Sequence, residues 1–260
     1  MISTLPLAIA TRLEKAAIDN GFDLSVSVEG GWLGFGSSQT RLRIWLSALG
    51  EGLFVLALSR RSVFDGLDGQ GIPFANPLPE GASGARSVSD LVALHRMVRR
   101  AFQLSRALPD EPLQIFLKRT AGMPASTEAE RLVVQRVGQD VFRNGLFDYW
   151  EGRCPLSGLA VVELLRASHI KPWADCETDA ERLDVFNGLL LAPHLDAAFD
   201  RGFMTLDDDG CVVPADSLDA GARAALGLAG SLPAVSLTDI HRAYLVWHRR
   251  RVFRGAGRAS

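Results

Sequence analysis

The sequence predicts an α+β fold in two parts, an N-terminal α+β domain at residues 1–120 and a C-terminal domain at residues 121–260. Amphipathic helical segments and short strand-like segments both occur in the first part, and long helical segments begin and end the second. A length of 260 residues allows one large domain or two small ones. An apolar content of 47% is enough for a hydrophobic core.

The first part opens with a helix and three strands. Residues 5–21 carry apolar side chains at helical spacing, and Gly21 is expected to end the helix. Apolar and polar residues alternate in residues 22–30 and 40–50, as they do in half-buried strands. Residues 52–59 form a continuous apolar run, which is typical of a buried strand.

A loop and a basic helix complete the first part. Residues 69–85 are rich in glycine and proline, so a loop is expected there. The next helix is expected at residues 87–108, with Ser87 or Ser89 as its N-cap. Its arginines form either a solvated face or a surface for nucleic acid: Arg96, Arg99, Arg100 and Arg106.

The second part starts with a long helix. Residues 108–126 are a connection with a short helix, and Thr127 and Glu130 form the capping box of a helix that runs to residue 150. A polar turn follows. Two short apolar runs follow at residues 159–170 and 187–193, and then a short helix at residues 194–202 that Gly202 ends. A hairpin at residues 203–214 has its turn at Asp209–Gly210. A final amphipathic helix with a basic end is expected at residues 238–253.

Cysteine spacing and hydropathy exclude several classes of protein. Cys154, Cys176 and Cys211 lie far apart and form no C-x-x-C pair, so neither a zinc knuckle nor a disulfide framework is expected. The opening segment MISTLPLAIATRLEK has no basic start and no long apolar stretch, which argues against a signal peptide. No run of about 18 apolar residues exists, so no membrane span is expected. We therefore expect a reduced, soluble, cytoplasmic protein without a membrane partner.

Charge is distributed unevenly along the chain. The net charge of −2 does not indicate a protein covered in positive charge. Residues 129–200 carry seven basic and twelve acidic side chains, a net −5, whereas residues 235–260 carry six arginines and one aspartate, a net +5. This pairing indicates either a metal site beside a phosphate-binding surface or a solvated helix end.

A histidine and two carboxylates are candidates for chemistry. His169 has the side chain whose charge changes most easily near neutral pH. Asp196 and Asp200 are four residues apart in an expected helix, so their carboxylates share one face and repel unless a cation lies between them. Such oxygen ligands suit Mg²⁺ or Mn²⁺, and Arg201 is the alternative partner.

Two further polar residues are ambiguous when taken alone. Asn187 precedes Gly188 ahead of an apolar run, which is a common turn signal. His194 follows Pro193 at the start of the expected helix, where it is either a structural residue or a metal ligand.

The order and spacing of these residues resemble the HNH endonuclease family, which is built on a ββα-metal finger. In that family a histidine ends the first strand of a hairpin, an asparagine follows the loop, and the next helix supplies metal ligands. The resemblance covers about residues 128–205. The matching residues are Cys154, Ser157, Gly158, Ala167, Ser168, His169, Ile170, Pro172, Trp173, Asn187, Gly188, Leu189, Phe199, Asp200 and Gly202.

The resemblance implies a role for each part of the site. His169 would be the general base that takes a proton from water, and Asn187 would hold the loop that orients it. A divalent cofactor, Mg²⁺ or Mn²⁺, would polarise the scissile phosphate and stabilise the leaving 3′ oxygen.

Two sets of ligands for this ion are possible. Many relatives have a metal ligand where Ser168 stands, and a histidine where Asp196 stands. The resemblance therefore implies a shell of Asp200 with either Asp196 or His194, completed by water.

The resemblance thus implies a metal-dependent endonuclease that hydrolyses DNA, with restriction or defence as the role suggested by analogy. Two alternatives stay open: a nucleic-acid-binding module that no longer cuts, and a ribonuclease toxin that uses the same finger on RNA. The N-terminal domain is expected to recognise the target, and the sequence allows an oligomer. Phosphate contacts are expected from Arg166, Lys171, Arg250 and Arg254.

Overall fold

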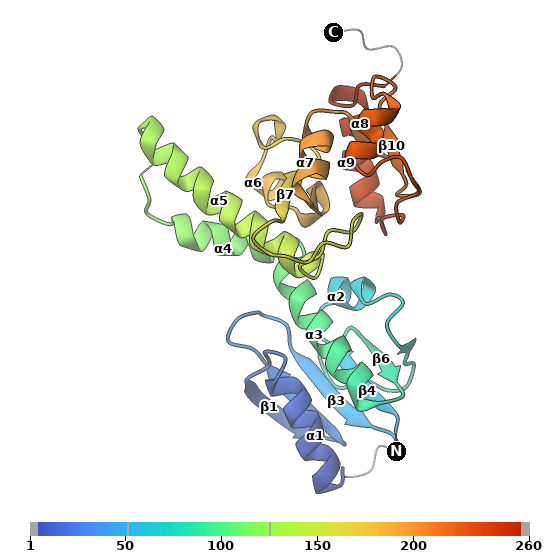
Figure 1. Ribbon diagram of the computed structural model, residues 1–260. Helices are drawn as coiled ribbons and strands as arrows, with labels where there is room; N and C mark the ends of the chain where they lie inside the picture. The colour runs from blue at the N-terminus through green and yellow to red at the C-terminus, as the bar shows by residue number, and fades with distance from the viewer. Residues whose placement is uncertain (1–4, 51, 125, 256–260) are drawn as a thin grey trace. The chain divides into compact units, whose positions relative to one another are not determined.

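The computed structural model describes residues 5–50, 52–124 and 126–255 (Figure 1). Helices and sheets both occur, which confirms the α+β class. The chain forms two compact units, of which the first ends at Glu111 and the second begins at Pro112. The sequence had placed this boundary near residue 120.

The first unit is built on a six-stranded antiparallel sheet with the strand order β1-β2-β3-β4-β6-β5. Two of its central strands, β2 and β6, were not predicted, and β5 lies inside the expected loop. The strands are β1 (Leu24–Glu29), β2 (Trp32–Gly36), β3 (Ile44–Ala48), β4 (Phe54–Leu58), β5 (Ile72–Pro73) and β6 (Gly84–Val88).

Helices cover one face of this sheet (Figure 1). Helix α1 (Leu7–Ile18) packs against β2, β3 and α3 (Leu91–Ala107), and α3 packs against β4 and β6. The short helix α2 (Arg61–Gly66) packs against β4, β6 and α3. Leu46 and Leu56, which face each other on β3 and β4, are fully buried.

Helix α3 begins later than the sequence indicated. Its N-cap is Asp90, whose carboxylate accepts a hydrogen bond of 2.7 Å from the N–H of Ala93. The prediction of Ser87 or Ser89 was wrong because β6 extends to Val88 and takes Ser87 into the sheet. Arg96 and Arg99 of this helix are exposed.

The second unit contains the long helix α5 (Glu128–Tyr149), preceded by α4 (Glu111–Thr120). The predicted capping box is confirmed: Thr127 Oγ accepts from the N–H of Glu130 at 3.2 Å, and the Glu130 carboxylate accepts from the N–H of Thr127 at 2.9 Å. Helix α5 packs against both strands of an antiparallel ribbon formed by β7 (Arg166–His169) and β8 (Gly188–Leu191).

Short elements surround this ribbon. Helix α7 (Pro193–Asp200) packs against β7, and Gly202 follows it with φ +73°, so the predicted helix end is confirmed. The predicted hairpin is also present, and among the described residues none of the helices combines the length and hydrophobicity that a membrane span requires. The other elements are η1 (Trp173–Asp175), α6 (Asp179–Arg182), η2 (Val185–Asn187), β9 (Met204–Leu206), β10 (Val212–Pro214), α8 (Ala220–Ala225) and α9 (Asp239–Arg251).

Candidate active site

His169 ends strand β7 and lies opposite Gly188, the first residue of β8. Its imidazole stacks on Phe142 of α5, with ring centroids 3.7 Å apart and ring planes 15° apart. A Cβ atom added at position 188 would lie 2.5 Å from Cζ of Phe142. Glycine at this position therefore lets α5 pack closely on the ribbon and support the histidine from behind.

A backbone carbonyl fixes the orientation of the imidazole. Nε2 of His169 lies 2.9 Å from the carbonyl oxygen of Arg182. Because a carbonyl oxygen only accepts, Nε2 must donate, and the neutral ring then has no proton on Nδ1. Among the described residues no group hydrogen-bonds to Nδ1, so its lone pair is available to accept a proton.

Burial lowers the pKa of His169 from 6.5 to about 4, and the hydrogen bond to the Arg182 carbonyl opposes this shift. Removal from water disfavours the charged ring by more than this one hydrogen bond favours it. The imidazole is therefore neutral near neutral pH, which is the state that a proton acceptor requires.

Asn187 is fully buried and joins the two ends of the loop between β7 and β8. Its Oδ1 accepts from the N–H of Lys171 at 2.8 Å. Its Nδ2 donates to the carbonyls of Lys171 and Glu181, both at 3.2 Å. Since the next residue after Glu181 supplies the carbonyl that orients His169, these bonds place the histidine's partner.

Lys171 is engaged within the same loop. Its ammonium pairs with Glu181 at 2.7 Å, its side chain is only 12% exposed, and the hydrogen bond to Glu181 raises its pKa. Arg182 also stabilises the loop by donating to the carbonyls of Trp173 and Cys176. The phosphate contact expected from Lys171 would therefore require the pair with Glu181 to open.

Asp184 and Tyr244 support this loop, and neither was predicted from the sequence as a site residue. Asp184 caps η2 by accepting from the N–H of Phe186 at 2.9 Å, and it accepts from the hydroxyl of Tyr244 on α9 at 3.1 Å. Burial raises the pKa of the Asp184 carboxyl. An aspartate at the start of a turn is a recognisable local signal, but its partner lies 60 residues further along the chain.

Ser168 links the ribbon to the acidic face of α7. Its hydroxyl donates to Oδ1 of Asp200 at 3.0 Å, and Asp196 lies one turn earlier on the same helix. Burial raises the pKa of both carboxyls, and the charge of Asp196 raises that of Asp200 further. Neither carboxylate forms an ion pair with Arg201 or with any other residue in the part of the chain that the structure describes.

His194 lies apart from this face. It is exposed in the first turn of α7, six residues before Asp200 and two before Asp196. At about 100° per residue these offsets rotate its side chain by about 240° and 200° from the two carboxylates. The helix therefore brings Asp196 and Asp200 together and directs His194 elsewhere.

The acidic pair has the chemistry of a divalent-metal site. Two neighbouring carboxylates that form no ion pair with any described residue suit Mg²⁺ or Mn²⁺, which prefer oxygen ligands and usually retain several waters. In residues 5–50, 52–124 and 126–255, no three His, Cys, Asp or Glu side chains converge on one point. The oxygen donors of Asp196 and Asp200 fit a hard divalent ion only if water or substrate oxygens complete its shell.

A family comparison identifies the segment that carries these residues. Residues 154–207 match the family model described as HNH endonuclease. This segment belongs to the HNH endonuclease family. The resemblance seen in the sequence is thereby confirmed for residues 154–207, hereafter the HNH segment, which contains the β7–β8 ribbon, its loop and α7. No curated protein matches the chain.

The remaining expected phosphate contacts lie inside and after the HNH segment. Arg166 is exposed at the start of β7, and its charge acts to lower the pKa of Asp196. Arg250 and Arg254 are exposed beyond the segment, and the Arg254 guanidinium lies 4.5 Å from the centre of the Phe203 ring. The neighbouring Arg249 is instead occupied by the Leu206 carbonyl and by Asp208.

Proposed function

We propose that the protein is a metal-dependent endonuclease that hydrolyses phosphodiester bonds of DNA, with His169 as the general base. The observation that carries this proposal is the hydrogen bond between His169 Nε2 and the Arg182 carbonyl. It leaves the unprotonated Nδ1 as the basic atom of the ring. The HNH family of this segment supports nuclease chemistry.

In the proposed reaction Nδ1 of His169 takes one proton from a water molecule. The water oxygen forms a bond to phosphorus, and the bond from phosphorus to the 3′ oxygen breaks. The leaving oxygen becomes a 3′ hydroxyl by taking a proton from solvent, and the other product carries a 5′ phosphate. A substrate phosphate beside the imidazolium would stabilise the proton and raise the pKa of His169 toward the working range.

Asp196 and Asp200 would hold the metal, and Ser168 would position Asp200. When bound, the ion supplies Lewis-acid chemistry at the phosphate and stabilises the leaving oxygen. Asn187 would act as a positioning residue, because its bonds hold the loop that carries the Arg182 carbonyl.

A cleavage assay tests the proposal. Supercoiled plasmid DNA, single-stranded DNA and structured RNA are incubated with the full chain and Mg²⁺ or Mn²⁺. We expect wild-type protein to nick or cut DNA, and the His169→Ala variant to lose about a hundredfold or more of the rate while DNA binding is retained. His95→Ala, which changes a histidine outside the HNH segment, is the matched control.

The rival functions predict different results. If no nucleic acid is cut but DNA is bound, the chain is a binding module and the proposal fails. If RNA is cut and DNA is not, the ribonuclease alternative is correct. A role in restriction or defence within the cytoplasm is the setting we propose, by analogy with nucleases joined to a separate recognition domain.

A further inference from the structure

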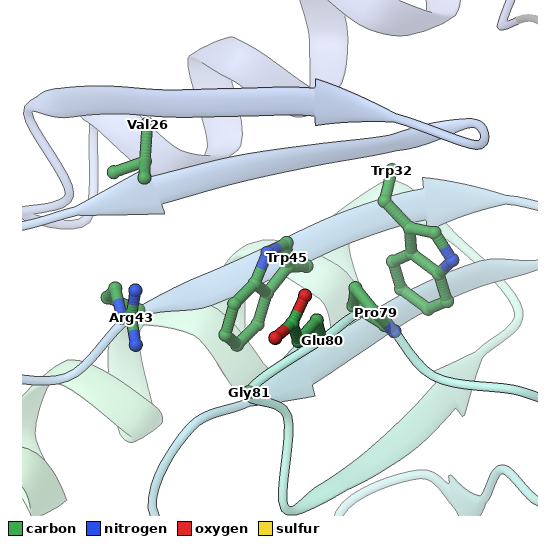
Figure 2. Close-up of a pocket in the computed structure, with 7 residues that line it drawn as sticks. All are labelled: Val26, Trp32, Arg43, Trp45, Pro79, Glu80 and Gly81. Carbon is green, nitrogen blue, oxygen red and sulfur yellow. The ribbon is translucent and has the colours of Figure 1, made fainter.

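The pocket on the sheet of the first unit offers no aromatic face to a ligand. Trp32 and Trp45 are 4% and 6% exposed, and Pro79 and Glu80 lie between their rings (Figure 2). We therefore assign no ligand to this pocket. The second unit has another feature without an assigned role, the helix α9, which follows the HNH segment in the chain.

One face of α9 carries two buried histidines and a tyrosine. His241, Tyr244 and His248 follow one another at spacings of three and four residues, so their side chains lie along one side of the helix. His241 is fully buried, and His248 is 1% exposed. A rise of 1.5 Å per residue places the first and the last of them about 10 Å apart along the axis. This face is therefore long enough to contact two separate elements.

The N-terminal half of α9 packs on η2, at the end of the loop that orients the proposed base. The Tyr244 hydroxyl donates to Oδ2 of Asp184 at 3.1 Å, and Oδ1 of Asp184 accepts from the N–H of Phe186 at 2.9 Å. The His241 ring meets the Phe186 ring edge-on, with centroids 5.1 Å apart and planes 87° apart. Because Asn187 directly follows Phe186, these contacts fix the residue that anchors the loop.

The C-terminal half of α9 holds the helix of the acidic pair. The His248 ring stacks on the Phe199 ring, with centroids 4.0 Å apart and planes 6° apart. Nε2 of His248 lies 3.2 Å from the Phe199 carbonyl oxygen, which only accepts, so Nε2 donates. Nδ1 then accepts from the Thr205 hydroxyl at 3.0 Å. Since Asp200 directly follows Phe199, these contacts fix the end of α7 that carries this carboxylate.

The chain after α9 makes a further contact at the same end of α7. The N–H of Arg254 donates to the carbonyl of Gly202 at 2.9 Å. Gly202 has φ +73°, and a Cβ atom added there would overlap the carbonyl oxygen of Val252. A side chain at position 202 would therefore push the two segments apart. The glycine that ends α7 also permits this packing.

We propose that α9 fixes the loop of the base relative to the acidic helix, with Tyr244 and His248 as positioning residues for cleavage. A base and a metal act on one phosphate only at a set separation, and a displacement of about 1 Å can cost about a hundredfold in rate. The hydrogen bond from Ser168 to Asp200 is one link between the two elements, and α9 is a second. This proposal rests on the proposed function, because α9 itself is given no chemical step.

Two substitutions each release one end of α9. Tyr244→Phe removes the hydroxyl that donates to Asp184, and His248→Leu removes the hydrogen bonds to Phe199 and Thr205. Single-turnover cleavage is measured at saturating DNA and metal. Each substitution should lower the rate constant by about tenfold or more, because the reacting groups lose their separation. The dissociation constant for DNA should stay that of the wild-type protein, since neither residue is expected to touch DNA.

Two further variants separate positioning from loss of stability. His248→Gln retains a side-chain N–H that can donate to the Phe199 carbonyl, so it should recover part of the rate lost in His248→Leu. Leu228→Ala opens a cavity at a buried residue outside α9 and the HNH segment, so it should lower the melting temperature and leave the rate constant unchanged. If Leu228→Ala slows cleavage as much as Tyr244→Phe does, the positioning role is wrong.

The double variant of Tyr244→Phe and His248→Leu tests whether α9 links the two elements. If it does, releasing one end already loses their relative position, so the double variant should be about as slow as the slower single variant. If the two losses in rate multiply instead, Tyr244 and His248 act locally and independently, and the proposal is overturned.

Hydrogen exchange, measured by mass spectrometry without metal or DNA, tests the same link without cleavage. His248→Leu should accelerate exchange in α7 and also in residues 171–187, whereas Leu228→Ala should not. Acceleration confined to α7 would contradict the link. If wild-type protein cuts no nucleic acid but shows the coupled exchange, the proposed function fails and the structural link stands; cleavage without coupled exchange would overturn the role of α9 alone.

Discussion

The hydroxyl of Ser168 and the carboxylate of Asp200 are joined by a hydrogen bond of 3.0 Å, which links the strand that ends at His169 to the helix that carries the acidic pair. Ser168, which is a weak metal ligand by itself, thus holds Asp200, a predicted metal ligand, in place. The bond also favours the ionised form of Asp200, although burial and the charge of Asp196 together outweigh it.

Replacing Asp200 should separate metal binding from stability. In Asp200→Asn the Mn²⁺ dissociation constant should rise by about tenfold or more, because a charged ligand is lost. Without metal, the melting temperature should rise at neutral pH, because the raised pKa of Asp200 shows that its charged form is disfavoured in the fold. Calorimetric titration and thermal unfolding in chelator measure the two effects.

The same titration distinguishes the two proposed ligand sets. Asp196→Asn should weaken Mn²⁺ binding, whereas His194→Ala should not, since α7 directs His194 away from the acidic face. Asp216→Asn, an exposed carboxylate outside the site, is the matched control. Loss of Mn²⁺ binding in His194→Ala with normal binding in Asp196→Asn would contradict this assignment.

Asn187→Ala should lower both stability and activity. The substitution leaves the N–H of Lys171 and the carbonyl of Glu181 without a hydrogen-bond partner, and leaves the Lys171 carbonyl only the Cys176 thiol, at a cost of about 1–3 kcal/mol. Urea unfolding measures this cost, and Asn144→Ala at an exposed position of α5 serves as its control. Cleavage should fall as well, since the loop no longer holds the Arg182 carbonyl in place. Full activity in a folded Asn187→Ala variant would remove the positioning role.

Stability should decrease on mild acidification. Burial lowers the pKa of His169, His241 and His248 from 6.5 to about 4. Between these values the unfolded chain binds more protons than the fold, so the free energy of unfolding falls as pH falls through this window. The loss from about pH 7 to about pH 5 should be on the order of a few kcal/mol. Urea unfolding across this range tests it, and a slope unchanged in His248→Gln would show that this histidine does not contribute.

The basic end of α9 should contribute to DNA affinity and its salt dependence. Arg250 and Arg254 are exposed, and replacing both by Gln should reduce the slope of log affinity against log salt by about one to two units. Fluorescence anisotropy with DNA over a salt series measures the slope, with Arg12→Gln as the control. An unchanged slope together with a lowered melting temperature would mean that these arginines only stabilise the helix end.

Local patterns predicted the elements whose determinants lie close together in the sequence. The capping box of α5 was found because Thr127 and Glu130 are three residues apart. Strand β2 was missed because Gly34 and Gly36 interrupt its apolar pattern, and β6 because buried Arg86 and its small neighbours resemble a loop. β2 and β6 are strands because they pair with neighbouring strands, and no short stretch of sequence indicates that pairing.

In the candidate site, too, residues that belong to a short motif could be proposed from the sequence, whereas contacts between distant residues could not. His169, Asn187 and Asp200 were proposed from the order of the HNH motif that the sequence resembles, and Asp196 from its spacing of four residues from Asp200; their roles stay predictions. The pairing of Lys171 with Glu181 could not be predicted, because it depends on how a loop folds back on itself. The role of Tyr244 depends on a contact across 60 residues, and a single sequence contains no signal for such a contact.

The acceptor that orients His169 is a main-chain atom, and this has a consequence for genetics. No replacement at position 182 deletes a carbonyl, so a substitution screen would score the arginine side chain there and leave the orienting bond undetected. A substitution can disturb that hydrogen bond only by changing a residue that sets the path of the backbone. Asn187 is such a residue, because it donates to the carbonyl of Glu181, next to Arg182. A map of inactivating mutations in this loop would therefore identify Asn187 and would not identify the carbonyl oxygen of Arg182.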